Sequence, residues 1–250
     1  MNAFRRIALA SLAAPLALGL AACSDSETAD GEIAEGEAIA AIPAPDGTTW
    51  TDTVAVSDYD GYVMGNPDAP IKVIEYGSLT CGACAAFAAD GIEPLRDKYV
   101  ASGVVSYELR NQVHNGLDLV LARLVRCGAP ESFHPLSEQV WLNLESVFEG
   151  ANKNPQVLEQ AMSLPEDQRF VAVAQGTGLL DFFAARGLPT DQARACLADS
   201  ASVMAIAERS DTQSKELEVS GTPTFFINGK NIGTQNWVSL EPMLQRAGAR

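Results

Sequence analysis

The sequence has few basic residues and almost no histidine. Its 250 residues include 17 Lys and Arg against 32 Asp and Glu, a formal net charge of -15, and only two His. Phosphate binding needs clustered Lys and Arg, so this balance argues against a nucleic-acid partner. The two histidines, His114 and His134, show no metal-ligand spacing to each other or to cysteine, which argues against a metal site.

Cysteine is also scarce, and only two of the five lie close together. Cys81 and Cys84 have the C-x-x-C spacing of a redox pair. A four-cysteine zinc site would need a second close pair, and Cys127 and Cys196 stand singly. A purely structural Cys81–Cys84 disulfide is the other alternative, but so small a loop constrains little chain entropy.

The N-terminus predicts export rather than a folded element. Residues 1–22 have a basic start and an apolar run that is too short to span a membrane, as in a signal peptide. The stretch from Leu20 to Cys23 resembles a bacterial lipobox, which implies that Cys23 carries a lipid anchor. The alternative is an ordinary cleaved signal with an incidental cysteine. Ser24, where Asp would retain a lipoprotein at the inner membrane, weakly favours the outer membrane.

Residues 23–50 predict an acidic tether between the anchor and the domain. The stretch contains no Lys or Arg, and Ala, Gly and Pro occupy most positions between the acids. With little apolar surface to bury and like charges along its length, we expect it to stay solvated and extended. An acidic docking site for a partner is the alternative. Export also implies an oxidising periplasm, where disulfides persist.

The remaining residues, 51–250, predict one α/β domain that opens with a strand-helix-strand unit. Residues 71–76 form an apolar run typical of a buried strand, and a helix follows from Cys81 to about Tyr99 with a kink at Pro94. Residues 104–110 alternate as a second strand, and residues 54–56 fit a short edge strand.

A helical block at about 111–211 then interrupts the sheet. We expect helices at residues 117–125, 133–148, 156–162, 167–183 and 191–217. The sheet resumes with a strand at 220–227, a hairpin turn at Asn228-Gly229, a return strand at 231–233 and a closing helix at 240–247.

The position of the cysteine pair predicts different roles for its members. A thiol attacks only as a thiolate, and a helix N-terminus lowers its pKa through unpaired N–H groups and the helix dipole. Cys81 stands at that position, whereas Cys84 lies one turn deeper. We therefore expect Cys81 to attack and bond the substrate, and Cys84 to resolve the mixed disulfide.

Two segments resemble the DsbA-like branch of the thioredoxin superfamily. They are Glu75 to Cys84 and Ser220 to Gly229, and the resemblance covers about Tyr62 to the C-terminus. It implies a thioredoxin fold with the helical block inserted between its β-α-β and β-β-α halves, and no bound cofactor.

The resemblance also implies roles for three residues. Pro223 matches a cis-proline beside the cysteine pair, and Thr222 matches the residue before it, which tunes redox behaviour. Glu75 matches a buried acid beneath the site. Burying a carboxylate in an apolar strand costs free energy, so such a residue is expected to have a function. A proton shuttle for Cys84 is the expected role; the alternative is an edge position with Glu75 in water.

The sequence departs from the family pattern between the two cysteines. Strongly oxidising members usually have Pro-His there, and this chain has Gly82-Ala83, so we expect a less depressed Cys81 pKa and a less oxidising potential. The favoured function is a periplasmic, membrane-tethered thiol–disulfide oxidoreductase that introduces disulfides into exported proteins.

A quinone-coupled membrane partner would restore the disulfide of such an oxidase. A reductase or isomerase kept reduced by a membrane transporter is the alternative, although the stretch from Ser24 to Asp60 is too short for the isomerase type's dimerisation domain, so we expect a monomer. A non-enzymatic copper-delivery module is a third, less favoured possibility.

Cys127 and Cys196 remain. In an oxidising compartment two leftover cysteines in one helical block are expected to pair, as a structural disulfide that staples the block. The alternative is two buried free thiols.

Overall fold

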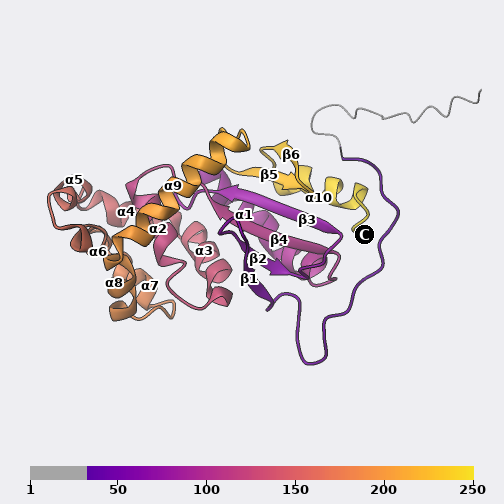
Figure 1. Cartoon of the computed structure of the whole chain (residues 1–250), viewed down its shortest axis with the longest axis horizontal. Coiled ribbons are helices and arrows are strands. Elements are labelled where there is room, and N and C mark those ends of the chain that lie inside the picture. The colour runs from indigo at the N-terminus through magenta and orange to yellow at the C-terminus, as the bar shows by residue number, and fades with distance from the viewer. Residues whose placement is uncertain (1–32) are drawn as a thin grey trace, which may run out of the picture.

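A mixed sheet of six strands in the order β1-β2-β4-β3-β5-β6 runs through the domain (Figure 1). The strands are β1 (Val54–Val56), β2 (Tyr62–Gly65), β3 (Ile71–Gly77), β4 (Val105–Asn111), β5 (Thr224–Ile227) and β6 (Lys230–Gly233). The structure is a computed structural model, and it describes residues 33–250. The predicted signal peptide and the predicted lipidation site, Cys23, lie outside the described residues.

β3 lies in the middle of the sheet, where the site needs it. It pairs in parallel with β4 and antiparallel with β5. The first of these pairs is the predicted strand-helix-strand unit, since α1 (Gly82–Pro94) connects the two strands. β2 was not predicted, because its four residues lie between the turn signals of Gly61 and Asn66, and it pairs with both β1 and β4.

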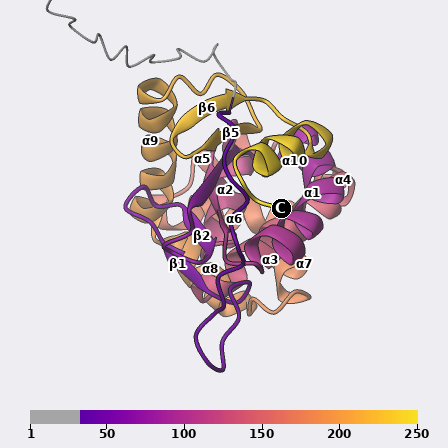
Figure 2. The ribbon, with the colours of Figure 1, turned by 90° about the vertical axis from the view of Figure 1, so that its right-hand side faces the viewer.

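The two faces of the sheet pack against different helices (Figure 2). On the face towards α1 lies the main core, where the rings of Phe87 and Phe225 are 4.7 Å apart. On the other face Tyr76 packs with Val219 and Phe226 and donates its hydroxyl to Gln213 on α9 (Ser200–Glu216). Because side chains alternate along β3, Glu75 points to the α1 side and Tyr76 to the α9 side.

The helical block forms one end of the molecule, at the left of Figure 1. Its other elements are α2 (Gly116–Leu124), η2 (Pro130–Ser132), α3 (Phe133–Leu142), α4 (Leu144–Asn152), α5 (Val157–Met162), α6 (Glu166–Gly176), α7 (Leu179–Ala184) and α8 (Thr190–Ala198). Three predicted helices are each broken in two. The breaks fall at Asn143, at Gly178 with a left-handed φ of 79°, and at Asp199, which caps α9 through Ser202.

Two further helices complete the domain. α1 ends at Pro94, and the chain continues as a π-helical turn, η1 (Leu95–Val100), where the sequence predicts a kink. The closing helix α10 (Trp237–Arg246) starts three residues earlier than predicted, with a capping box between Asn236 and Ser239. No helix within residues 33–250 has the length and apolar character needed to cross a membrane.

The last part of the predicted tether lies against the domain instead of standing free. The Gly36 and Ile39 N–H groups donate to the carbonyls of Arg246 and Gly248, at 2.8 and 2.9 Å. Ile39 packs on the core, and Trp50 Nε1 donates to the Ile42 carbonyl at 2.7 Å. Residues 36–42 therefore run along the domain, held by backbone hydrogen bonds and by the packing of Ile39, while none of them is fully buried.

The helical block contains the predicted disulfide. Cys127, just after α2, is bonded to Cys196 on α8, so the prediction of a staple is confirmed and the two free thiols are not found. It joins segments that are 69 positions apart in the sequence.

Candidate active site

Cys81 occupies the junction between the central strand and its helix. After β3 the chain turns at Ser78–Thr80, and Cys81 is the N-cap residue of α1, with φ -92° and ψ 122°. Its Sγ accepts a hydrogen bond from the Cys84 N–H at 3.4 Å. The sulfur therefore satisfies one of the N–H groups that a helix start leaves unpaired, as the sequence predicts.

This position favours the thiolate. The pKa of Cys81 is lowered from 9.0 to about 5, first by a hydrogen bond from the Cys84 side chain and then by bonds from Thr222 and from the N–H groups of Cys84 and Ala83, against the opposing effect of burial. The shift arises although Gly82 and Ala83 provide no side-chain donor. The partner cysteine, Thr222 and the backbone N–H groups lower the pKa instead.

Cys84 has the opposite environment. Its side chain is fully buried in the core, whereas Cys81 is half-buried. The pKa of Cys84 is raised well above its ordinary value by the hydrogen bond with Cys81, by burial and by the charge of Glu75. The pair therefore consists of an accessible thiolate and a buried thiol.

Glu75 lies beneath the pair, buried in the central strand. Burial raises its pKa from 4.5 to about 8, partly offset by the hydrogen bond from Tyr107, whose hydroxyl donates to Oε2 at 2.6 Å. Its other oxygen, Oε1, has no hydrogen-bond partner among the described residues. The predicted burial of Glu75 is confirmed, and the alternative of an edge position in water is wrong.

The loop before β5 completes the site. The Thr222–Pro223 peptide bond is cis, as the resemblance implied. The Thr222 carbonyl lies 3.3 Å from Cys81 Sγ, so the loop faces the accessible sulfur. The structure therefore brings together all five residues that the sequence assigned to the site: Glu75, Cys81, Cys84, Thr222 and Pro223.

Three side chains that were not predicted from the sequence hydrogen-bond to the turn before Cys81. The buried carboxylate of Asp118 accepts hydrogen bonds from Ser78 Oγ at 2.7 Å and from the Leu79 N–H at 2.9 Å. Trp141 Nε1 donates to the Ser78 carbonyl, and Asn115 Nδ2 donates to Thr80 Oγ1. The signal that could have found Asp118 is its place in the first turn of α2, three residues after a capping Asn.

The two histidines have unrelated surroundings. His114, in the exposed loop after β4, has its Nε2 3.4 Å from Thr222 Oγ1, at the rim of the site. His134 is buried and donates from Nε2 to the Tyr62 carbonyl at 3.0 Å, and burial lowers its pKa to about 4. Within residues 33–250 no three His, Cys, Asp or Glu side chains are grouped as metal ligands.

Comparison with known proteins places this geometry in a family. Residues 57–246 match the family model described as Thioredoxin. A Rickettsia bellii protein with the provisional name protein-disulfide oxidoreductase is 24% identical over 77% of this chain and 65% of its own length. The chain thus spans less than two thirds of that relative.

Two solved structures share the fold. The protein-disulfide isomerase of Novosphingobium aromaticivorans has a TM-score of 0.67 and 29% identity, covering 74% of this chain and 96% of the isomerase. The alpha-DsbA1 of Wolbachia pipientis has a TM-score of 0.61 and 22% identity, covering 76% and 92%. The family model covers most of the domain, the C-x-x-C pair stands at the start of α1, and the fold is shared with these two structures; the chain therefore belongs to the thioredoxin family.

Proposed function

We propose that the protein is a thiol–disulfide oxidoreductase that acts on cysteines of exported proteins and introduces disulfides into them. One observation carries the proposal: an accessible cysteine caps the start of α1, where its pKa is lowered to about 5, and it is hydrogen-bonded to a buried cysteine whose pKa is raised. The names of the R. bellii and N. aromaticivorans proteins support the same class of reaction.

The asymmetry of the pair gives the order of the chemical steps. In the oxidised protein a substrate thiolate attacks Cys81 Sγ, the Cys81–Cys84 bond breaks, and Cys84 leaves with the electron pair. The second thiolate of the substrate then attacks the substrate sulfur that is bonded to Cys81, and Cys81 is released as a stable thiolate. The substrate loses two electrons and gains a disulfide, and the protein becomes the dithiol.

Glu75 is the proton donor in this scheme. The sulfur of Cys84 is poorly stabilised as a thiolate in the core, so its departure requires a proton. With a pKa of about 8, Glu75 holds a proton at neutral pH and can give it to Cys84 and later recover it. The Thr222–Pro223 loop would pair with the extended substrate segment beside Cys81.

We also propose a location and partners. The export signal and the lipobox-like stretch ending at Cys23 support attachment to a membrane on the periplasmic side, the outer membrane being weakly favoured. The oxidised pair would be restored by a quinone-coupled membrane partner. The protein would act as a monomer.

A second candidate reverses the electron flow. The N. aromaticivorans neighbour is called an isomerase, and Gly82-Ala83 lacks the histidine of strongly oxidising members. In that case the Cys81 thiolate attacks a substrate disulfide, and a reducing transporter keeps the pair as a dithiol.

Equilibration of the Cys81–Cys84 pair against glutathione buffers distinguishes the two. As an oxidase, the pair should have a potential well above the roughly -270 mV of thioredoxin. A value near that of thioredoxin would overturn the oxidase assignment in favour of the reductase. Failure of the pair to exchange with glutathione at all would refute both.

A further inference from the structure

We infer that Tyr107 carries protons between Glu75 and solvent, through a cavity that lies between the sheet, α3 and the α1–η1 helix. The inference rests on the proposed function, because it concerns the acid that serves Cys84. It makes Tyr107 a positioning and relay residue that acts through Glu75 and touches no substrate.

Glu75 needs such a route because the protein encloses it. Tyr107 is the hydrogen-bond partner of Oε2, and Oε1 has none among residues 33–250. A carboxyl that gives its proton to Cys84 must recover one before the next turnover, and Cys84 is itself fully buried. The proton therefore has to arrive from the side of Glu75 that faces away from the cysteines.

A cavity borders Tyr107, the hydrogen-bond partner of Glu75. It has a volume of about 260 Å³, and its buried wall includes Tyr107, Leu109 and Trp141. Two of these side chains and the free oxygen surround the same glycine: a Cβ placed on Gly77 would lie 3.1 Å from Glu75 Oε1, 3.1 Å from Leu109 Cδ1 and 3.3 Å from Trp141 Cζ2. The unpartnered oxygen and the cavity wall thus meet around Gly77.

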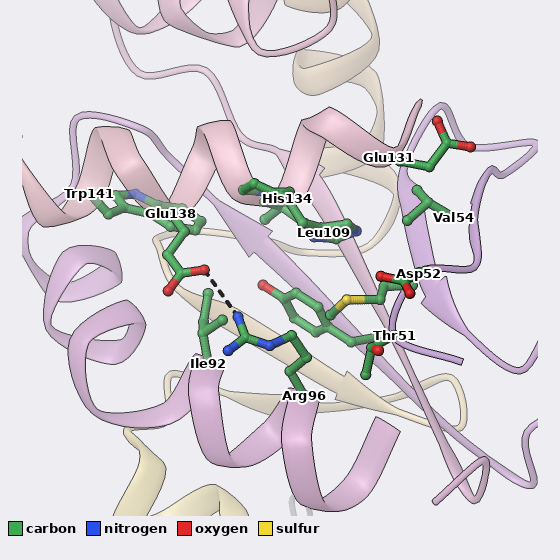
Figure 3. Close-up of a pocket in the computed structure, with 13 residues that line it drawn as sticks. Thr51, Asp52, Val54, Ile92, Arg96, Leu109, Glu131, His134, Glu138 and Trp141 are labelled. Carbon is green, nitrogen blue, oxygen red and sulfur yellow. Dashed lines mark hydrogen bonds and ion pairs between the residues drawn. The ribbon is translucent and has the colours of Figure 1, made fainter. Parts of the chain in front are cut away.

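The outer end of the cavity is polar and reaches the surface. Figure 3 shows Glu138 on α3 and Arg96 on η1 pointing towards each other across the space, joined by an ion pair of 3.4 Å. Both side chains are partly exposed, at 24% and 32%. Asp52 and Glu131, which are exposed, line the far end. Water and small buffer molecules can therefore reach the space that Tyr107 borders.

The relay step is balanced in protons. When Glu75 has given its proton to the Cys84 thiolate, the Tyr107 hydroxyl donates its proton to Glu75 Oε2 and takes one on its oxygen from a donor in the cavity. No electrons move, and Tyr107 ends as it began. A free tyrosinate is not required, which agrees with the strongly raised pKa of Tyr107, caused by burial and by Glu75.

Other charged and titratable groups are distributed consistently with this direction. Cys81 and Cys84 interact electrostatically with Glu75, the Tyr107 hydroxyl of β4 donates a hydrogen bond to it, and the charge of Glu138 on α3 acts on Tyr107. His134 borders the cavity, but it is held neutral by burial.

The main test uses Tyr107→Phe, which keeps the ring and removes the relay hydroxyl. In single-turnover reduction of the oxidised protein by a dithiol peptide, the variant should be slower by roughly a hundredfold, the lower end of what a positioned proton-transfer group contributes. The double variant with Glu75→Gln should be no slower than Glu75→Gln alone, because Tyr107 acts only through Glu75. Tyr76→Phe is the matched control: it also removes a buried, hydrogen-bonded hydroxyl, on the opposite face of β3, and should keep the wild-type rate.

A second test leaves Tyr107 intact and blocks the cavity. Val54→Phe adds a ring at the cavity wall, and Ala55→Phe adds the same ring on the opposite face of β1. Only Val54→Phe should slow the reaction and raise its solvent deuterium isotope effect. Wild-type rates in both Val54→Phe and Tyr107→Phe, or additive losses in the double variant, would overturn the relay. An inactive wild-type protein would instead refute the proposed function.

Discussion

At the scale of single residues, residues of the site that are close in the sequence have opposite surroundings. Cys81 and Cys84 are three positions apart, yet the first caps the helix and the second enters the core. Glu75 and Tyr76 are adjacent, yet they serve opposite faces of the sheet. Each contrast follows from a simple periodicity, of the helix turn in one case and of the strand in the other.

The roles of the two cysteines can be separated by substitution. Cys81→Ser should abolish insulin reduction, because the attacking sulfur is lost. Cys84→Ser should retain attack and accumulate a mixed disulfide with substrate, visible by mass spectrometry of non-reduced samples. Activity that survives Cys81→Ser, or mixed disulfides that form on Cys84 in its absence, would contradict the assignment.

The lowered pKa of Cys81 predicts a pH dependence. Alkylation of the reduced protein by iodoacetamide should rise with pH around a midpoint near 5, because only the thiolate reacts. The same shift stabilises the reduced fold as the pH rises from about 5 towards 9.0, and that stability is lost as the pH falls through 5. An alkylation midpoint near 9.0 would show that the helix start does not hold the thiolate.

At the scale of elements, the helical block supports the active-site turn. Asp118 of α2 and Trp141 of α3 bind the N–H and the carbonyl of the Ser78–Leu79 peptide group, and Asn115, in the loop before α2, donates to Thr80. The insertion thus fixes the residues that lead into Cys81, in addition to covering the sheet.

Asp118→Ala should therefore destabilise the fold and loosen the turn. Loss of the carboxylate removes the acceptor of the Leu79 and His114 N–H groups and of the Ser78 hydroxyl, at a cost of about 3 kcal/mol in the free energy of unfolding. Urea unfolding measures this. Asp181→Ala, an exposed acid in the first turn of α7, is the control and should change stability by less than about 0.5 kcal/mol. Equal losses in the two variants would argue against the anchoring role.

At the scale of the whole molecule, segments distant in sequence hold the domain together. The stretch from Gly36 to Ile42 hydrogen-bonds to Arg246, Gly248 and Ser102. The disulfide between Cys127 and Cys196 ties the end of α2 to α8. Because of these hydrogen bonds and this disulfide, neither the stretch from Gly36 to Ile42 nor the end of α2 can move away from its partner segment without breaking a bond.

Removal of that disulfide should lower stability. The combined Cys127→Ser and Cys196→Ser variant opens a loop of 69 positions. The chain-entropy model then predicts a loss of about 4 kcal/mol in the free energy of unfolding. Urea unfolding of the variant should match that of wild-type protein treated with a reductant strong enough to open the bond. Unchanged stability would mean that the insertion needs no staple.

The sequence by itself determined the local features of this protein. The strand at 71–76, the helix start at Cys81, the Asn228-Gly229 hairpin and the helical character of the insertion all follow from spacing and turn chemistry, which act over a few residues. The burial of Glu75 was also correctly predicted, as an implication of the family resemblance, and so was the Cys127–Cys196 bond, from the two cysteines left over in the helical block.

Only the tertiary structure decided what faces what. The hydrogen bond from Tyr107 to Glu75 depends on the register of β3 with β4, and the contact of His114 with Thr222 joins positions 108 apart. The breaks at Asn143 and Asp199 and the docking of residues 36–42 likewise come from packing against distant elements. Such contacts are set by how whole surfaces fit, and local sequence patterns carry no information on that distance scale.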